Sequence, residues 1–171
     1  LWTGGRRHVG SSENAVLGFD TGRDRWCKVT GRMVEREGGG YILKAEYDPP
    51  IPWMKEQRTL HEAVTCPDGR VYVMGGWRLV EGAPEPGGDP MGRDVEYVND
   101  SVECYDPAKN TWTCRRPMPS PRMFFAAVAM PDGRIYVFGG QTADERHYRN
   151  LKVLDVVEVY DPAGDTWTRA G

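Results

Sequence analysis

Hydrophobic residues occur in this chain as short runs of about four, each bounded by turn-forming residues. Two runs, Val71–Met74 and Ile135–Phe138, are β-branched and aromatic, and each follows an Asp-Gly pair that favours a tight turn. Two others, at 102–105 and 157–160, alternate apolar and polar residues and lead into Asp-Pro. This pattern predicts strands joined by turns, and therefore an all-β fold.

The same runs return because a longer unit is repeated. Two segments recur at an offset of 64 residues: Pro-Asp-Gly-Arg, at 67–70 and 131–134, and a Gly pair, at 75–76 and 139–140. The stretch from Tyr105 to Trp112 recurs from Tyr160 to Trp167 at an offset of 55, so the unit varies in length only between the Gly pair and the Tyr. A segment that varies while its flanks are fixed is typical of a loop between strands.

A third, more worn copy opens the chain with Gly4-Gly5, Phe19-Asp20 and Trp26. With a Gly pair, an aromatic-Asp and a Trp in each unit, the chain resembles the kelch-repeat family. The resemblance implies that each unit is a four-stranded antiparallel blade of a β-propeller. It predicts a partial kelch-type propeller of about three blades, forming one domain. The predicted units are an incomplete first blade with an inserted hairpin (residues 1–57), a second blade (58–116) and a third blade (117–171).

Closed propellers typically have about four to eight blades, so three blades are too few to close a ring. Either the chain is part of a longer propeller or two copies meet to close a ring. An open arc of blades would expose apolar faces at its ends, which predicts self-association through the end blades.

Charge and cysteine usage narrow the class of protein. The net charge is −3 with both signs dispersed, so no nucleic-acid partner is expected. No apolar run approaches about 18 residues, so no membrane span is expected. The four cysteines, Cys27, Cys66, Cys104 and Cys114, lack Cys-x-x-Cys spacing. We expect free thiols and a cytoplasmic protein.

Antiparallel topology places the long connections together. The connection between the second and third strands leaves a blade from the same face as the connection to the next blade, while the tight turns leave from the opposite face. Variable loops on one rim of a rigid scaffold are typical of a binding face. The candidate partner-binding residues on this face are Arg58, Arg122, Trp77, Arg93, Tyr97, Arg146, His147, Tyr148 and Arg149.

Each candidate has a second interpretation. Arg58 and Arg122 could bind an acidic peptide through bidentate contacts, or could form ion pairs within their own blades. Trp77, Tyr97 and Tyr148 could be partner anchors, or could pack their own loops. Glu103 and Glu158 occupy equivalent positions, which favours a repeated structural carboxylate over an acid/base pair.

The sequence predicts a protein–protein interaction module without cofactor, metal or catalytic residues. The three histidines lie far apart in the repeat, and no phosphate-binding loop or catalytic triad order is present. The alternative is a carbohydrate-active kelch propeller. For a sugar oxidase, the resemblance implies clustered His and Tyr ligands, which this chain does not offer. A sugar mutarotase needs fewer recognisable residues.

Overall fold

The structure is a computed structural model, and it describes most of the chain from residue 54 onward together with strands at the N-terminus. The described residues are 2–6, 12–17, 19–20, 25–26, 28–35, 41–48, 52, 54–80, 95–143 and 151–170. Within these ranges the regular structure consists of β-strands, joined by turns and bends. The all-β prediction is therefore confirmed.

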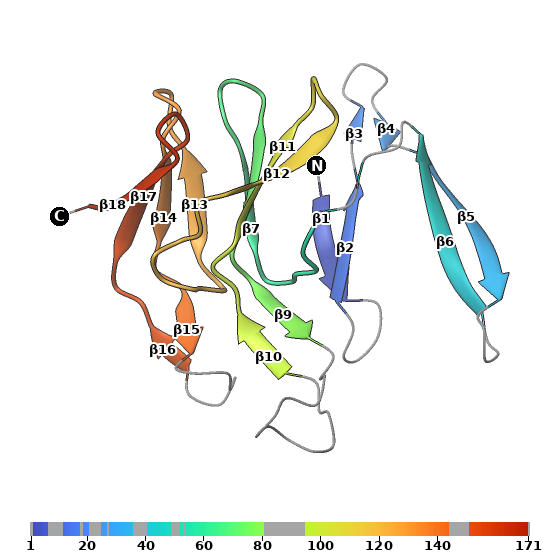
Figure 1. The fold of residues 1–171 in the computed structure, drawn as a ribbon, viewed down its shortest axis with the longest axis horizontal. Coiled ribbons are helices and arrows are strands. Elements are labelled where there is room, and N and C mark those ends of the chain that lie inside the picture. The colour runs from blue at the N-terminus through green and yellow to red at the C-terminus, as the bar shows by residue number, and fades with distance from the viewer. Residues whose placement is uncertain are drawn as a thin grey trace.

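Two four-stranded antiparallel sheets form blades two and three (Figure 1). Blade two contains β7 (Glu62–Thr65), β8 (Val71–Met74), β11 (Val102–Asp106) and β12 (Thr111–Arg115). Blade three contains β13 (Ala126–Ala129), β14 (Ile135–Phe138), β17 (Val157–Asp161) and β18 (Thr166–Arg169). The spatial order is β7-β8-β11-β12 in one and β13-β14-β17-β18 in the other. Each repeat therefore folds as one meander of four strands.

Three two-stranded ribbons precede these blades. They are β1 (Trp2–Arg6) with β2 (Ser12–Leu17), β3 (Phe19–Asp20) with β4 (Arg25–Trp26), and β5 (Lys28–Glu35) with β6 (Tyr41–Asp48). The last ribbon lies within residues 1–57, where the sequence predicts an inserted hairpin. Its pairing extends from Glu35 and Tyr41 to Lys28 and Asp48.

The connections predicted as long loops begin and end as strands. In blade two, β9 (Trp77–Val80) pairs with β10 (Val95–Val98), and in blade three, β15 (Gln141–Ala143) pairs with β16 (Leu151–Val153). Proline and glycine in the middle of the first connection had obscured the β-rich residues at its two ends. Figure 1 shows that both hairpins leave their blades at the same end, opposite the tight turns. β10 also contacts β15 of the neighbouring blade.

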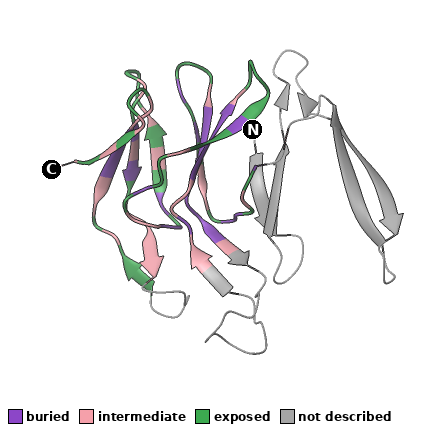
Figure 2. Cartoon of the chain, viewed as in Figure 1, coloured by how far each residue is buried: buried purple, intermediate pink, exposed green. Residues whose placement is uncertain are grey.

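The core lies between the two blades. Val64, Tyr72 and Met74 of blade two pack in one cluster with Ile135 and Val137 of blade three. A second cluster, on the other side of blade two, contains Val71, Val73, Tyr105, Trp112 and Met54. The central strands of blade two, β8 and β11, are therefore buried on both faces, and Figure 2 shows exposed residues along β13 of blade three.

A hydrogen bond closes the turn between the last two strands of each blade. The Tyr160 hydroxyl donates to Asp165 Oδ1 at 2.5 Å, and the Tyr105 hydroxyl donates to Asn110 Oδ1 at 2.7 Å. Both accepting residues have positive φ, 49° for Asp165 and 52° for Asn110, a conformation that Asn and Asp tolerate. Both blades thus have Asn or Asp at the turn position where the backbone has positive φ.

We expect the acid sensitivity of stability to decrease in Asp165→Asn. The hydrogen bond from Tyr160 is the main cause that lowers the pKa of Asp165 below its ordinary value. A carboxyl group with a lowered pKa stabilises the fold above its unfolded pKa of about 3.9, and this contribution is lost as pH falls through the folded pKa. An amide oxygen accepts the same bond in blade two and does not titrate.

Urea midpoints measured from pH 6 down to pH 2 check this prediction. The midpoint of Asp165→Asn should fall less steeply than that of the wild type below about pH 4. Parallel profiles for the two proteins would contradict it.

Candidate functional site

Arg58 lies where the chain turns into β7, at the end that carries the long hairpins, and its side chain is fully buried. Its Nη2 donates to Glu103 Oε1 at 2.7 Å and to Ser101 Oγ at 2.8 Å. Its Nη1 donates to the carbonyl oxygens of Gly75 at 3.2 Å and Ser101 at 3.0 Å. Glu103 is itself buried and accepts the backbone N–H groups of Lys55 and Glu56. The hydrogen-bond acceptors of the guanidinium therefore all belong to its own blade.

Arg122 repeats this arrangement in blade three. It is fully buried, and its Nη2 donates to Glu158 Oε2 at 2.6 Å. Its Nη1 donates to the Gly139 carbonyl at 2.8 Å. Ser120 Oγ donates to the second oxygen of Glu158 at 2.8 Å. Two equivalent positions therefore hold two equivalent buried ion pairs.

Burial lowers the pKa of both arginines, and the opposing carboxylate offsets only part of this shift, so each pKa stays below the ordinary value. Arginine keeps its proton in proteins, so both pairs remain ionic. The structure thus corrects the expectation that Arg58 and Arg122 face an acidic partner, because neither guanidinium has exposed surface. The second interpretation, ion pairing within the blade to a structural carboxylate, is the observed one.

Blade two adds a second carboxylate where blade three has Ser120. Glu56 accepts hydrogen bonds from Asn99 Nδ2 at 3.0 Å and Ser101 Oγ at 2.8 Å, and lies 3.6 Å from Arg78 Nη1. Burial raises the pKa of Glu56, but these hydrogen bonds and the charge of Arg78 outweigh it, so the pKa is lower than usual. Glu56 links the approach to β7 with the base of the β9–β10 hairpin.

Arg78 and Tyr97 extend this network along the β9–β10 hairpin. The Arg78 guanidinium carbon lies 5.5 Å from the centre of the Tyr97 ring, a cation–π arrangement across the paired strands β9 and β10. Both residues are half-buried. Tyr97 was a sequence-predicted candidate, whereas Arg78 was missed. The signal that could have found Arg78 is its position directly after Trp77, in a run of strand-forming residues.

The other candidates divide into buried and undescribed residues. Trp77 is 2% exposed, and its backbone exchanges hydrogen bonds of 2.9 and 2.7 Å with Thr59. It packs the base of the hairpin, as the second interpretation held. Five candidates lie outside the described residues, and their roles stay predictions: Arg93, Arg146, His147, Tyr148 and Arg149.

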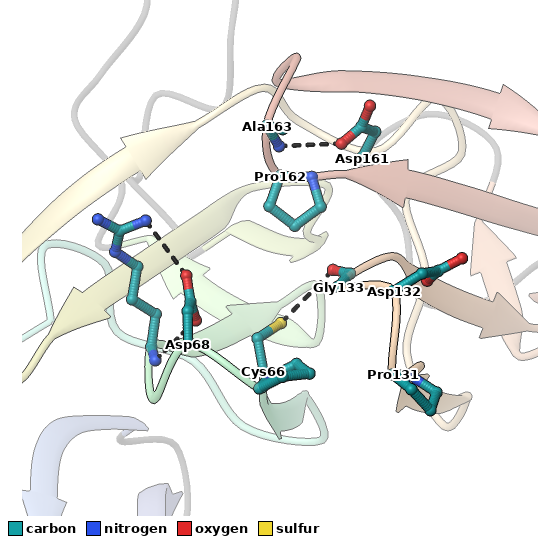
Figure 3. A pocket seen from close by; sticks show the side chains of 10 residues that line it. Cys66, Asp68, Pro131, Asp132, Gly133, Asp161, Pro162 and Ala163 are labelled. Atoms are coloured by element: carbon teal, nitrogen blue, oxygen red, sulfur yellow. Dashed lines mark hydrogen bonds and ion pairs between the residues drawn. The ribbon is translucent and has the colours of Figure 1, made fainter.

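A cavity of about 290 Å³ lies between the blades at the opposite end, among the tight turns (Figure 3). Its walls include Pro67, Pro131 and Pro162, with Asp68 and Asp132. These two carboxylates already accept hydrogen bonds from Arg70 and Arg134, which belong to the same turns. The described residues contain no group of three or more His, Cys, Asp or Glu placed to hold a metal ion.

Cys66 lines this cavity without the character of a nucleophile. Burial is the main cause that raises its pKa to about 11, so the thiol is protonated at neutral pH. Its Sγ points toward the Gly133 carbonyl in Figure 3, at 3.9 Å. Cys66, Cys104 and Cys114 are all free, as predicted, and Cys27 lies outside the described residues. No described helix is long and apolar enough to cross a bilayer.

Comparison with known proteins finds a matching family model and several similar proteins. Residues 92–119 and 122–171 match the family model described as Kelch motif. Kelch repeat and BTB domain-containing protein 12 of Homo sapiens is 29% identical over 157 residues, which cover 90% of this chain and 20% of that protein. Beta-scruin of Limulus polyphemus is 36% identical over 161 residues, covering 94% of this chain and 16% of that protein.

A third relative is F-box protein AFR of Arabidopsis thaliana, 31% identical over 124 residues, which cover 70% of this chain and 27% of that protein. This chain thus spans at most about a quarter of the length of these three relatives. The solved structure of YjhT superimposes with a TM-score of 0.54 at 15% identity, over 85% of this chain and 44% of that one. At this identity the similarity concerns the fold alone.

Proposed function

This chain is a kelch-repeat protein with a kelch-type β-propeller fold, and from that premise we propose that it acts as a protein-interaction module. The supporting observation is that β9–β10 and β15–β16 extend from the same end of two rigid blades and contact one another. Repeat proteins bind their partners on surfaces formed by connections that vary in length and are held by a fixed scaffold. Relatives that are named for BTB and F-box segments support an adaptor role.

The proposed contact surface is centred on the hairpins and excludes the two buried arginines. Arg78 and Tyr97 provide a cation and an aromatic ring, the residue types enriched where binding energy concentrates. Their positions are fixed by Glu56 below and by the pairing of β9 with β10 above. An acidic partner segment, if it binds here, would meet Arg78 rather than Arg58 or Arg122. A cytoplasmic location is part of this proposal, supported by the free thiols of Cys66, Cys104 and Cys114.

Selection from a peptide-display library tests the proposal with the chain as bait. Peptides that bind the wild type are expected to lose at least about tenfold in affinity for Arg78→Ala/Tyr97→Ala, a change of about 1.4 kcal/mol. The matched control is Arg134→Ala/Tyr136→Ala, which removes a second cation–π pair, with a separation of 5.9 Å, from another part of the surface. Peptides that depend on the control pair, or on neither pair, would contradict the proposed face.

The carbohydrate-active alternative receives no specific support from the described residues. Its direct test is incubation of the chain with a panel of aldoses, following anomer interconversion by polarimetry. A rate of anomer interconversion above the rate in buffer would show that the chain is an enzyme rather than an interaction module.

A further inference from the structure

Two of the described residues combine a positive φ with a large apolar side chain. Leu60 has a φ of 56° and Phe124 a φ of 52°, and they occupy equivalent positions at the offset of 64 residues. This conformation is uncommon outside glycine, asparagine and aspartate, because a bulky side chain crowds the backbone there. Leu60 and Phe124, here called the entry pair, each lie just before the first strand of a blade. The same backbone strain is therefore present in both blades.

The fold requires the turn at these positions but does not require a bulky residue. In blade two, Thr59 exchanges backbone hydrogen bonds of 2.9 and 2.7 Å with Trp77, and β7 begins shortly afterwards. The equivalent residues of blade three exchange hydrogen bonds of 2.9 and 2.8 Å. The chain must therefore turn between this bridge and the inner strand, and glycine would make that turn without crowding. The choice of leucine and phenylalanine needs a separate reason.

Packing within the molecule supplies only part of that reason. Leu60 remains 38% exposed although blade three adjoins it, and Phe124 is 55% exposed. The Phe124 N–H donates to the Leu60 carbonyl at 3.4 Å, so the two residues lie next to each other across the boundary between the blades. Strained residues persist where the surrounding structure holds them, and they cluster at ligand-binding sites. Strain, exposure and adjacency thus coincide at one place on the surface.

The entry pair lies at the end of the blades that carries the long hairpins. Thr59 and Trp77 form an antiparallel bridge. Leu60 directly follows one residue of this bridge, and Arg78 directly follows the other. The entry pair is therefore continuous with the contact surface proposed around Arg78.

The charged groups below this surface are already paired. Arg58 and Arg122 are fully buried and donate to Glu103 and Glu158. Burial is the main cause that raises the pKa of Glu62, the first residue of β7, so its carboxyl group is partly desolvated at the same entry. The chemistry that complements this part of the surface is therefore apolar.

We propose that the entry pair binds a large apolar side chain of the partner, aliphatic or aromatic, at the hairpin end of the two blades. This inference rests on the proposed interaction module and specifies what it recognises. The partner is a peptide or loop that presents Leu, Ile, Met, Phe or Trp next to the segment that meets Arg78. Binding would bury the apolar area that Leu60 and Phe124 expose in the free chain, which favours association.

Leu60→Asn/Phe124→Asn separates binding from folding, because asparagine tolerates positive φ, as Asn110 does in this chain at 52°. Peptides selected from a display library on the wild-type chain are expected to lose at least about tenfold in affinity for this variant. The urea midpoint of the variant should be no lower than that of the wild type, since relief of backbone strain offsets the partial burial that is lost.

A matching change in the peptide identifies the contact. Replacing the largest apolar residue of a selected peptide by serine should also lower its affinity for the wild-type chain at least about tenfold. The two losses should not add, because they remove the two sides of one contact. Met130→Asn is the control. Met130 is 40% exposed and directly follows β13, at the opposite end of the blade, so its substitution should leave the affinity unchanged.

Each contrary outcome has a distinct meaning. A urea midpoint below that of Met130→Asn would show that Leu60 and Phe124 serve the fold. Peptides that depend on Arg78 and Tyr97 but bind Leu60→Asn/Phe124→Asn normally would leave the interaction module in place and overturn this inference alone. Fully additive losses would place the apolar contact elsewhere on the chain. A library that yields no binder would contradict the interaction module, and the role of the entry pair with it.

Discussion

Glu103→Ala is expected to lower the free energy of unfolding by about 3–5 kcal/mol, the range for removing one partner of a buried ion pair. The substitution removes the carboxylate that lies 2.7 Å from the buried Arg58 guanidinium and leaves only the more distant Glu56 carboxylate, at 3.8 Å, among the ion pairs described for Arg58. It also leaves the N–H groups of Lys55 and Glu56 without their acceptor. Urea unfolding followed by tryptophan fluorescence measures the effect.

The equivalent substitution in blade three makes the expectation sharper. Glu158→Ala should cost less than Glu103→Ala, because Glu158 accepts from the side chains of Arg122 and Ser120, and within the described residues no backbone N–H group bonds to it as two do to Glu103. Asp132→Ala is the control, since its ion pair with Arg134 is about half exposed and should contribute little. A loss for Glu103→Ala no greater than for the control would mean that the buried pair is not a stabilising element.

Gly76→Ala is expected to be as damaging, for steric reasons. Gly76 has φ of +95°, and a Cβ added there would collide with the Thr59 carbonyl oxygen and lie 2.9 Å from His61 Cβ. Thr59 cannot retreat freely, because its N–H and carbonyl both bond to Trp77. We expect a loss of roughly 2–4 kcal/mol, combining backbone strain with overpacking.

Gly69→Ala separates the two causes. Gly69 also has positive φ, +82°, but nothing lies within 4 Å of an added Cβ. It should show only the backbone term, about 1–2 kcal/mol. Thermal unfolding of the two variants side by side gives the comparison, and equal losses would remove the steric explanation for the Gly pair.

The fold was predictable because the repeat contains residues that permit few alternative backbone conformations. The Gly pair, the Asp-Gly turn and the Tyr-Asp-Pro turn each require a particular backbone, so their spacing determines where strands begin and end. The observed strands Val71–Met74 and Ile135–Phe138 coincide with the predicted runs. Inside the variable connections no such residues mark the boundaries, and the hairpins β9–β10 and β15–β16 were missed.

The site was harder to predict because arginine has two opposite uses. A repeated Arg at the approach to an inner strand is compatible with ligand binding and with a buried ion pair. What decides between them is the distance to a glutamate 45 residues away in the chain for Arg58 and 36 residues away for Arg122. The repeated Glu suggested a structural role but did not identify its partner. Only the pairing of strands brings each Glu to its Arg.

The buried ion pairs also bear on how such a molecule can grow. Arg122, Gly139 and Glu158 all fall within one repeat, and so do Arg58, Gly75 and Glu103 in the other. Each unit therefore neutralises its own buried charge before it meets a neighbour. A gene duplication that adds or deletes one unit would leave no orphaned ion in the interior, so that copy number can change during evolution without first repairing the electrostatics.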